Sequence, residues 1–150
     1  HMRKMKVGKV TFTEAYKAVN EYRQKFPQKA VTFYAQNYPA MGWAVFMAGG
    51  SCPVIPCTDK AFLKDAAAME VEETNTDEYK KMVKSDIGSI IYSKSGTEIP
   101  VQLSSGKYVL KYIHPASGKI ETINKSLKIN GLYNLKVPDK KEGIYWFHKL

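Results

Sequence analysis

The sequence predicts an α+β fold, in which an N-terminal helix-strand-helix segment packs on a C-terminal antiparallel β-sandwich of the immunoglobulin-like, Greek-key type. One observation behind this is that residues 1–58 carry two helical patterns around a stretch rich in β-branched and aromatic residues. Another is that short strand patterns, separated by turn signals, recur in the C-terminal half at intervals of about 8 to 12 residues. We expect two parts, residues 1–58 and residues 59–150, the second with a short leading helix.

The length and composition agree with this size of fold. The chain has 150 residues, of which 44% are hydrophobic and 25% charged. These values are ordinary for one globular domain or two small ones, so they do not predict a disordered chain.

The first helix is expected to begin after Thr11. Thr11 and Glu14 have the spacing of a capping box, in which each side chain bonds to the other residue's backbone N–H. Apolar residues then recur at helical spacing until Pro27 interrupts the pattern.

The next 29 residues, 30–58, contain no Asp, Glu, Lys, Arg or His. We call them the neutral segment. Residues 30–36 are apolar on both faces and predict a strand covered from both sides. A helix is expected to open at Pro39 and to end at Gly49, and because it is apolar nearly all round it requires neighbours on several sides. A membrane helix is not expected, because the longest apolar run is far shorter than the roughly 20 residues that crossing requires.

A short helix is expected from Asp59, as its N-cap, to about Met69. Its inner face is predicted to carry Ala61, Phe62, Ala66 and Met69. Residues 70–86 mix both charge signs and predict one strand and a surface excursion.

Six further strands are expected, with the sequences GSIIYS, IPVQL, KYVLKYIH, KIETIN, LYNLKVP and IYWFHKL. The loop PASGK predicts a hairpin, since Gly118 can take a positive φ at low cost. Tyr108, Leu110 and Tyr112 share one strand face and are expected in the core, whereas Lys107 and Lys111 indicate that the other face meets water.

Several of these segments resemble a known arrangement. GWAVFMAGGSCPVIP (42–56), AFLKDAAAM (61–69), SIIYSKSG (89–96), IPVQL (99–103) and YVLKYIHPASGKIETI (108–123) are similar to the C-terminal region of bacterial glycoside-hydrolase-like proteins. There, a (β/α)8 barrel ends and a collagen-binding-type C-terminal β-sandwich follows. The resemblance runs from about residue 29 to the end, and it departs at His114, where such domains usually carry Asp or Asn.

This resemblance implies a non-catalytic accessory or structural domain of a protein that acts on polysaccharide, secreted or periplasmic. A complete barrel needs about 250 residues. The neutral segment is therefore expected either to pack against a preceding barrel or a second copy, or to dock as a reduced unit on its own sandwich. The alternative is a stand-alone module that binds a glycan or an extracellular matrix protein.

No catalytic residue and no cofactor are expected in this chain. Glycosidases need two carboxyl groups about 5 to 9.5 Å apart, placed in a barrel at the strand ends. The corresponding strand end here offers only Gln36, Asn37 and Tyr38. In a complete barrel these would be candidates to hydrogen-bond a sugar hydroxyl, and the alternative is that they cap the end of the strand. The remaining candidate ligand-binding residues are Tyr92, His114 and Trp146.

Cys52 and Cys57 leave three possibilities open: free packed thiols, a disulfide, or a metal site. Metal is the least favoured, because zinc would need further His or Cys ligands that the chain hardly offers. The formal net charge of +9 is spread over dispersed lysines without an arginine-rich stripe. An ordinary solvated surface is therefore the first expectation for these lysines, and among charged partners an acidic polysaccharide is expected before nucleic acid.

Overall fold

The structure is a computed structural model that describes residues 11–32, 39–51 and 53–150. The described residues form three helices followed by eight strands, so the fold is α+β with a β-sandwich-like arrangement. The helices are α1 (Phe12–Lys25), α2 (Pro39–Met47) and α3 (Lys60–Ala68). The strands are β1 (Glu70–Glu72), β2 (Tyr79–Lys84), β3 (Gly88–Ser93), β4 (Glu98–Gln102), β5 (Gly106–Ile113), β6 (Ile120–Ile129), β7 (Leu132–Lys136) and β8 (Gly143–Lys149).

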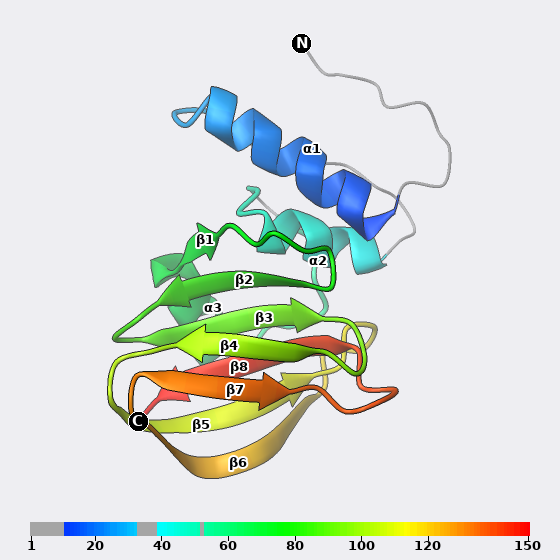
Figure 1. Ribbon diagram of the computed structural model, residues 1–150. Coiled ribbons are helices and arrows are strands. Elements are labelled where there is room, and N and C mark those ends of the chain that lie inside the picture. Colours follow the sequence, from blue (N-terminus) through cyan, green and yellow to red (C-terminus); the bar gives the residue numbers. More distant parts are fainter. Residues whose placement is uncertain (1–10, 33–38, 52) are drawn as a thin grey trace.

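The strands form two antiparallel sheets of unequal size. The larger has six strands in the order β1-β2-β3-β8-β5-β6, and the smaller pairs β4 with β7. The small sheet covers one face of the large sheet, and α2 and α3 lie on the other face (Figure 1). The molecule therefore has three layers, with the six-stranded sheet in the middle.

The core between the two sheets follows the strand alternation that the sequence predicts. Tyr108, Leu110 and Tyr112 of β5 are all buried there. The other face of β5 meets water only in part, since Lys107 is exposed and Lys111 is half-buried. Ile113 is fully buried under the helical layer, and the Lys111 ammonium lies 4.9 Å from the centre of the Trp146 ring.

The capping box at the start of α1 is confirmed. The Glu14 N–H donates to Thr11 Oγ1 at 3.2 Å, and the Thr11 N–H donates to Glu14 Oε2 at 3.0 Å. α1 packs against α2, through buried Ala15, Tyr16 and Val19.

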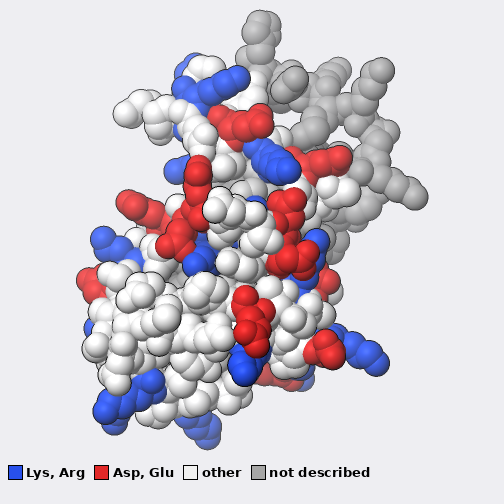
Figure 2. Space-filling view, viewed as in Figure 1, with Lys and Arg blue, Asp and Glu red and all other residues white. Residues whose placement is uncertain are grey.

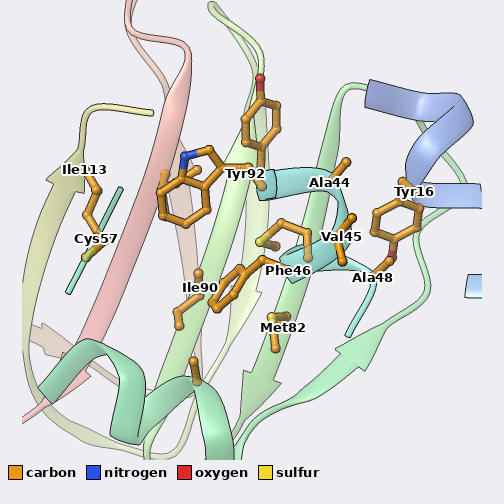
Figure 3. Packing of buried hydrophobic residues seen from close by; sticks show 14 of the residues in the cluster. Tyr16, Ala44, Val45, Phe46, Ala48, Cys57, Met82, Ile90, Tyr92 and Ile113 are labelled. Carbon is orange, nitrogen blue, oxygen red and sulfur yellow. The ribbon is translucent and has the colours of Figure 1, made fainter. Parts of the chain in front are cut away.

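The apolar helix α2 is buried on all sides by its own chain. Met41 and every residue from Trp43 to Ala48 are less than a tenth exposed. Figure 3 shows α2 between Tyr16 of α1 and Ile90 of the sheet. Gly49 ends the helix with a φ of 73°, as expected. The neighbours that the sequence requires are thus the sheet, α1 and α3.

A loop of the sheet holds the neutral segment in place. The β5–β6 turn is a hairpin in which the Gly118 N–H donates to the His114 carbonyl at 2.8 Å, as the sequence predicts. The Trp43 indole donates to the Pro115 carbonyl in this turn at 2.8 Å. A Cβ on Gly118 would lie 2.4 Å from the Pro56 carbonyl oxygen. The turn and residues 53–57 are therefore in backbone contact.

Two local predictions are wrong. Residues 30–32 do not form a strand covered from both sides, since Ala30 and Thr32 are exposed and neither belongs to a sheet. The rest of the predicted strand, residues 33–36, lies outside the described residues. Ala61 is exposed rather than on the inner face of α3, because the buried stripe is Phe62, Asp65 and Ala66, with Met69 just beyond it.

Candidate functional site

Of the six predicted ligand-binding residues the structure describes three, Tyr92, His114 and Trp146, and these three do not lie in one site. Gln36, Asn37 and Tyr38 lie outside the described residues. Tyr92 and His114 lie at the same end of the large sheet as the β5–β6 turn, and Trp146 of β8 lies in the core between this sheet and the helices.

Tyr92 and His114 each lie close to a glutamate. The Tyr92 hydroxyl donates to Glu142 Oε1 at 2.7 Å, and the Tyr112 hydroxyl donates to the Glu142 carbonyl at 2.6 Å from the other face. His114 Nε2 lies 3.2 Å from Glu121 Oε2 without a hydrogen bond to it, and Glu121 Oε2 accepts from Lys141 Nζ at 3.1 Å. The hydrogen bond from Lys141 is the main cause that lowers the pKa of Glu121.

Burial, followed by the bond to Glu142, raises the pKa of Tyr92. Its ring stacks on Phe12 at 4.2 Å between centroids, and only 8% of the residue is exposed, so little of the ring is open to a sugar. This cluster ties the ends of β3, β5, β6 and β8 together, which is a structural role.

Trp146 is fully buried, and its indole N–H donates to Asp65 Oδ2 at 2.9 Å. The same oxygen lies 2.6 Å from His148 Nδ1. The Asp65 side chain is only 8% exposed, whereas the His148 side chain is 35% exposed. The carboxylate therefore joins α3 to β8 and fixes the orientation of a partly exposed imidazole.

This imidazole borders a cavity of about 350 Å³ between the second half of α3, the β2–β3 turn and the end of β8. A carboxylate bonded to Nδ1 leaves Nε2 of a histidine free to act on a ligand, which is how general bases are held. A serine- or cysteine-type mechanism would also need a hydroxyl or thiol nucleophile in the cavity. Among the described residues, those that line the cavity are Lys64, Asp65, Ala68, Asp86, Ile87, His148, Lys149 and Leu150, without a hydroxyl or thiol.

The position of Asp65 in the sequence could have predicted that its carboxylate is buried. Asp65 follows Phe62 by three residues and so shares its face of α3. A carboxylate on an apolar face requires a buried partner. Its partners, Trp146 and His148, lie 81 and 83 positions along the chain.

A second pocket, of about 420 Å³, lies between α1 and the segment that joins β1 to β2. Its lining is polar, and it includes Asn20 on the helix and residues 73–77 on the facing segment. No sequence pattern pointed to this pocket, because its walls are far apart in the chain.

Cys57 is a free thiol, 3% exposed, whose pKa is raised mainly by burial. Cys52 lies outside the described residues. Within the ranges 11–32, 39–51 and 53–150, no group of three His, Cys, Asp or Glu side chains is arranged to hold a metal ion. The helices found in these ranges also lack the length and apolar character needed to cross a bilayer.

A family model described as "Domain of unknown function (DUF6298)" matches residues 1–69, up to the end of α3. A search of curated proteins finds no match. Among solved structures, a glycoside hydrolase is similar over 53% of this chain and 19% of its own, with 15% identity and a TM-score of 0.40.

Two structures of CapF are also similar to the chain. One, crystallised with the inhibitor 3-isopropenyl-tropolone, has 13% identity and a TM-score of 0.25, over 91% of this chain and 44% of its own. The other, the capsular polysaccharide assembling protein CapF from Staphylococcus aureus, has 12% identity and a TM-score of 0.18, over 98% of this chain and 57% of its own. The chain thus spans less than two thirds of each of these structures.

Proposed function

We propose that this chain is a non-catalytic accessory domain of a larger, exported protein that acts on polysaccharide, and that it binds the polysaccharide. The observation that carries the proposal is that the helical part and the β part of the chain pack together. The segment that resembles the end of a barrel is built into the chain's own core, where Trp43 bonds to Pro115 and α3 bonds to β8 through Asp65.

This packing favours one of the two arrangements that the sequence left open. α2 is a reduced unit docked on its own sandwich, so its buried side chains are not the surface that a preceding domain would contact. A contact with such a domain, or with a second copy, stays a prediction and would have to use other residues.

The Asp65–His148 pair is the arrangement most similar to a catalytic one among the described residues. Its carboxylate oxygen is shared between Trp146 and His148, and both contacts fasten α3 to the sheet. In the proposed function this pair supports the fold.

The test measures two things in one experiment, the binding of the chain to polysaccharides and the cleavage of their glycosidic bonds. The whole chain is incubated with a panel of plant and bacterial polysaccharides and with collagen, retention is measured by co-sedimentation, and new reducing ends are counted. We expect retention on at least one polysaccharide without new reducing ends.

Two results would overturn the proposal. One is that no polysaccharide retains the chain. The other is release of reducing ends that is lost in His148→Asn, which would make the Asp65–His148 pair catalytic. Retention on collagen alone would support the alternative, a matrix-binding module.

A further inference from the structure

The pocket between α1 and the β1–β2 segment exists only in the assembled domain. α1 contributes Tyr16, Lys17 and Asn20, of which the first and last lie one helical turn apart on the same side. Residues 73–77 form the opposite wall. Its volume of about 420 Å³ lies within the range of small-ligand sites.

The charges around this pocket balance. Lys17 and Lys80 are matched by Glu73 and Asp77. Figure 2 shows acidic and basic side chains interspersed where α1 meets β1 and β2. A pocket whose charges cancel does not select an ionic ligand over a neutral one.

Lys80 gives the pocket its shape. Its side chain is only 9% exposed, and its ammonium donates to the Thr76 carbonyl at 3.1 Å and to Thr74 Oγ1 at 3.4 Å. The ammonium also lies 4.7 Å from the centre of the Tyr16 ring. The facing loop is thereby held against α1, and the Lys80 ammonium covers the Tyr16 ring.

The groups that remain available can both give and accept hydrogen bonds. The side-chain amides of Asn20 and Asn75 make no hydrogen bond to another residue that the structure describes. Each side-chain amide carries a donor and an acceptor. A tyrosine hydroxyl is protonated at neutral pH and can donate. Burial, with a smaller effect of Glu73, raises the pKa of Tyr16 further, to about 12.

We propose that this pocket binds a neutral sugar residue of a polysaccharide through the Asn20 and Asn75 amides and the Tyr16 hydroxyl. Adjacent sugar hydroxyls are paired donors and acceptors, which is what side-chain amides from two walls of one pocket can match. This site rests on the proposed function, since it says where on the accessory domain the polysaccharide is held.

The experiment is calorimetric titration of the whole chain with arabinoxylan, galactomannan and mixed-linkage glucan, which are neutral, and with polygalacturonate, which is acidic. The variants are Asn20→Ala, Asn75→Ala and the double variant. Alanine is the better helix former, so Asn20→Ala keeps α1 intact. Asn130→Ala is the matched control, because Asn130 is exposed beyond β6, at the other edge of the sheet from β1 and β2.

We expect at least one neutral polymer to bind. Each single variant should weaken that binding about 2- to 10-fold, the effect of losing one hydrogen bond. The double variant should weaken it further, and Asn130→Ala should leave it unchanged. Binding to the neutral polymer should not change when the salt concentration is raised, because no net charge takes part.

The site and the function fail in different ways. If the wild-type chain binds a neutral polymer and the double variant binds it as Asn130→Ala does, the pocket is not the site and the proposed function stands. Binding only to polygalacturonate, lost at high salt, would overturn the neutral-sugar pocket. Absence of binding to every polymer would overturn both.

Discussion

At the scale of single residues, Asp65 makes the polar contact between α3 and the sheet. Replacing it with alanine leaves the fully buried Trp146 indole N–H without its acceptor. An unmatched buried donor costs roughly 1 to 3 kcal/mol, so we expect Asp65→Ala to lower the free energy of unfolding by about that amount. Urea denaturation measures the change.

Two further variants separate this bond from other effects. Asp65→Asn keeps an oxygen that can accept from Trp146, so it should lose less than Asp65→Ala. Asp86→Ala removes an exposed carboxylate that borders the same cavity and should change the free energy by less than about 0.5 kcal/mol. Equal losses in Asp65→Ala and Asp86→Ala would contradict the structural role of Asp65.

Buried tyrosines make the stability of the fold sensitive to alkaline pH. Burial is the first cause that raises the pKa of Tyr92 and Tyr145, and it raises that of Tyr16 from 10.0 to about 12. Above pH 10 the unfolded chain loses tyrosine protons that the folded chain keeps, so the free energy of unfolding must fall as the pH rises.

We expect the fall from Tyr16 to lie between pH 10 and about pH 12, with no contribution below pH 10. Urea unfolding at a series of pH values measures it. Tyr16→Phe keeps the ring beneath Lys80 but removes the titrating group, so its curve should fall less steeply. Identical slopes for the two proteins would rule Tyr16 out as a source.

At the scale of elements, the β5–β6 turn decides whether the neutral segment stays docked. Gly118 combines a φ of 74° with a Cβ position 2.4 Å from the Pro56 carbonyl oxygen. Gly96 has a similar φ of 71°, but its Cβ would meet only the Asp139 side chain, at 3.0 Å. The two glycines thus share the conformational cost of a side chain and differ in the backbone clash.

We therefore expect Gly96→Ala to cost about 1 to 2 kcal/mol, the price of a left-handed conformation, and Gly118→Ala to cost about 1 to 3 kcal/mol more. Thermal and urea unfolding compare the two. Losses of the same size would show that the turn does not press on Pro56 in solution.

The elements that sequence reasoning predicted well are those fixed by local chemistry. The capping box, the glycine end of α2 and the alternation of β5 each depend on residues a few positions apart. The prediction of a covered strand failed at residues 30–32, because apolar composition alone does not distinguish a covered strand from an exposed connection. The cavity beside His148 and the pocket beside Asn20 need walls from distant segments, so no local pattern could reveal them.

At the scale of the whole molecule, the middle sheet serves two cores at once. Ile90 of β3 and Trp146 of β8 face the helical layer, whereas Ile91 and Tyr145 beside them face the small sheet. Because neighbouring residues of one strand belong to opposite cores, the loss of one layer disturbs the other. The helical and β parts should therefore unfold together.

Removal of residues 1–58 tests this unity and the predicted boundary between residues 58 and 59. The deletion strips α1 and α2 from the sheet and uncovers large apolar side chains, among them Met82, Ile90, Tyr92 and Ile144. Exposing each costs roughly 1.5 to 3 kcal/mol, and several together match the 5 to 15 kcal/mol that stabilise a whole domain. We expect residues 59–150 alone to aggregate or to lack a cooperative transition by circular dichroism and size-exclusion chromatography, because α3 covers only part of that face. A soluble fragment with a sharp unfolding transition would show instead that the sandwich is an independent domain and that the neutral segment is an addition to it.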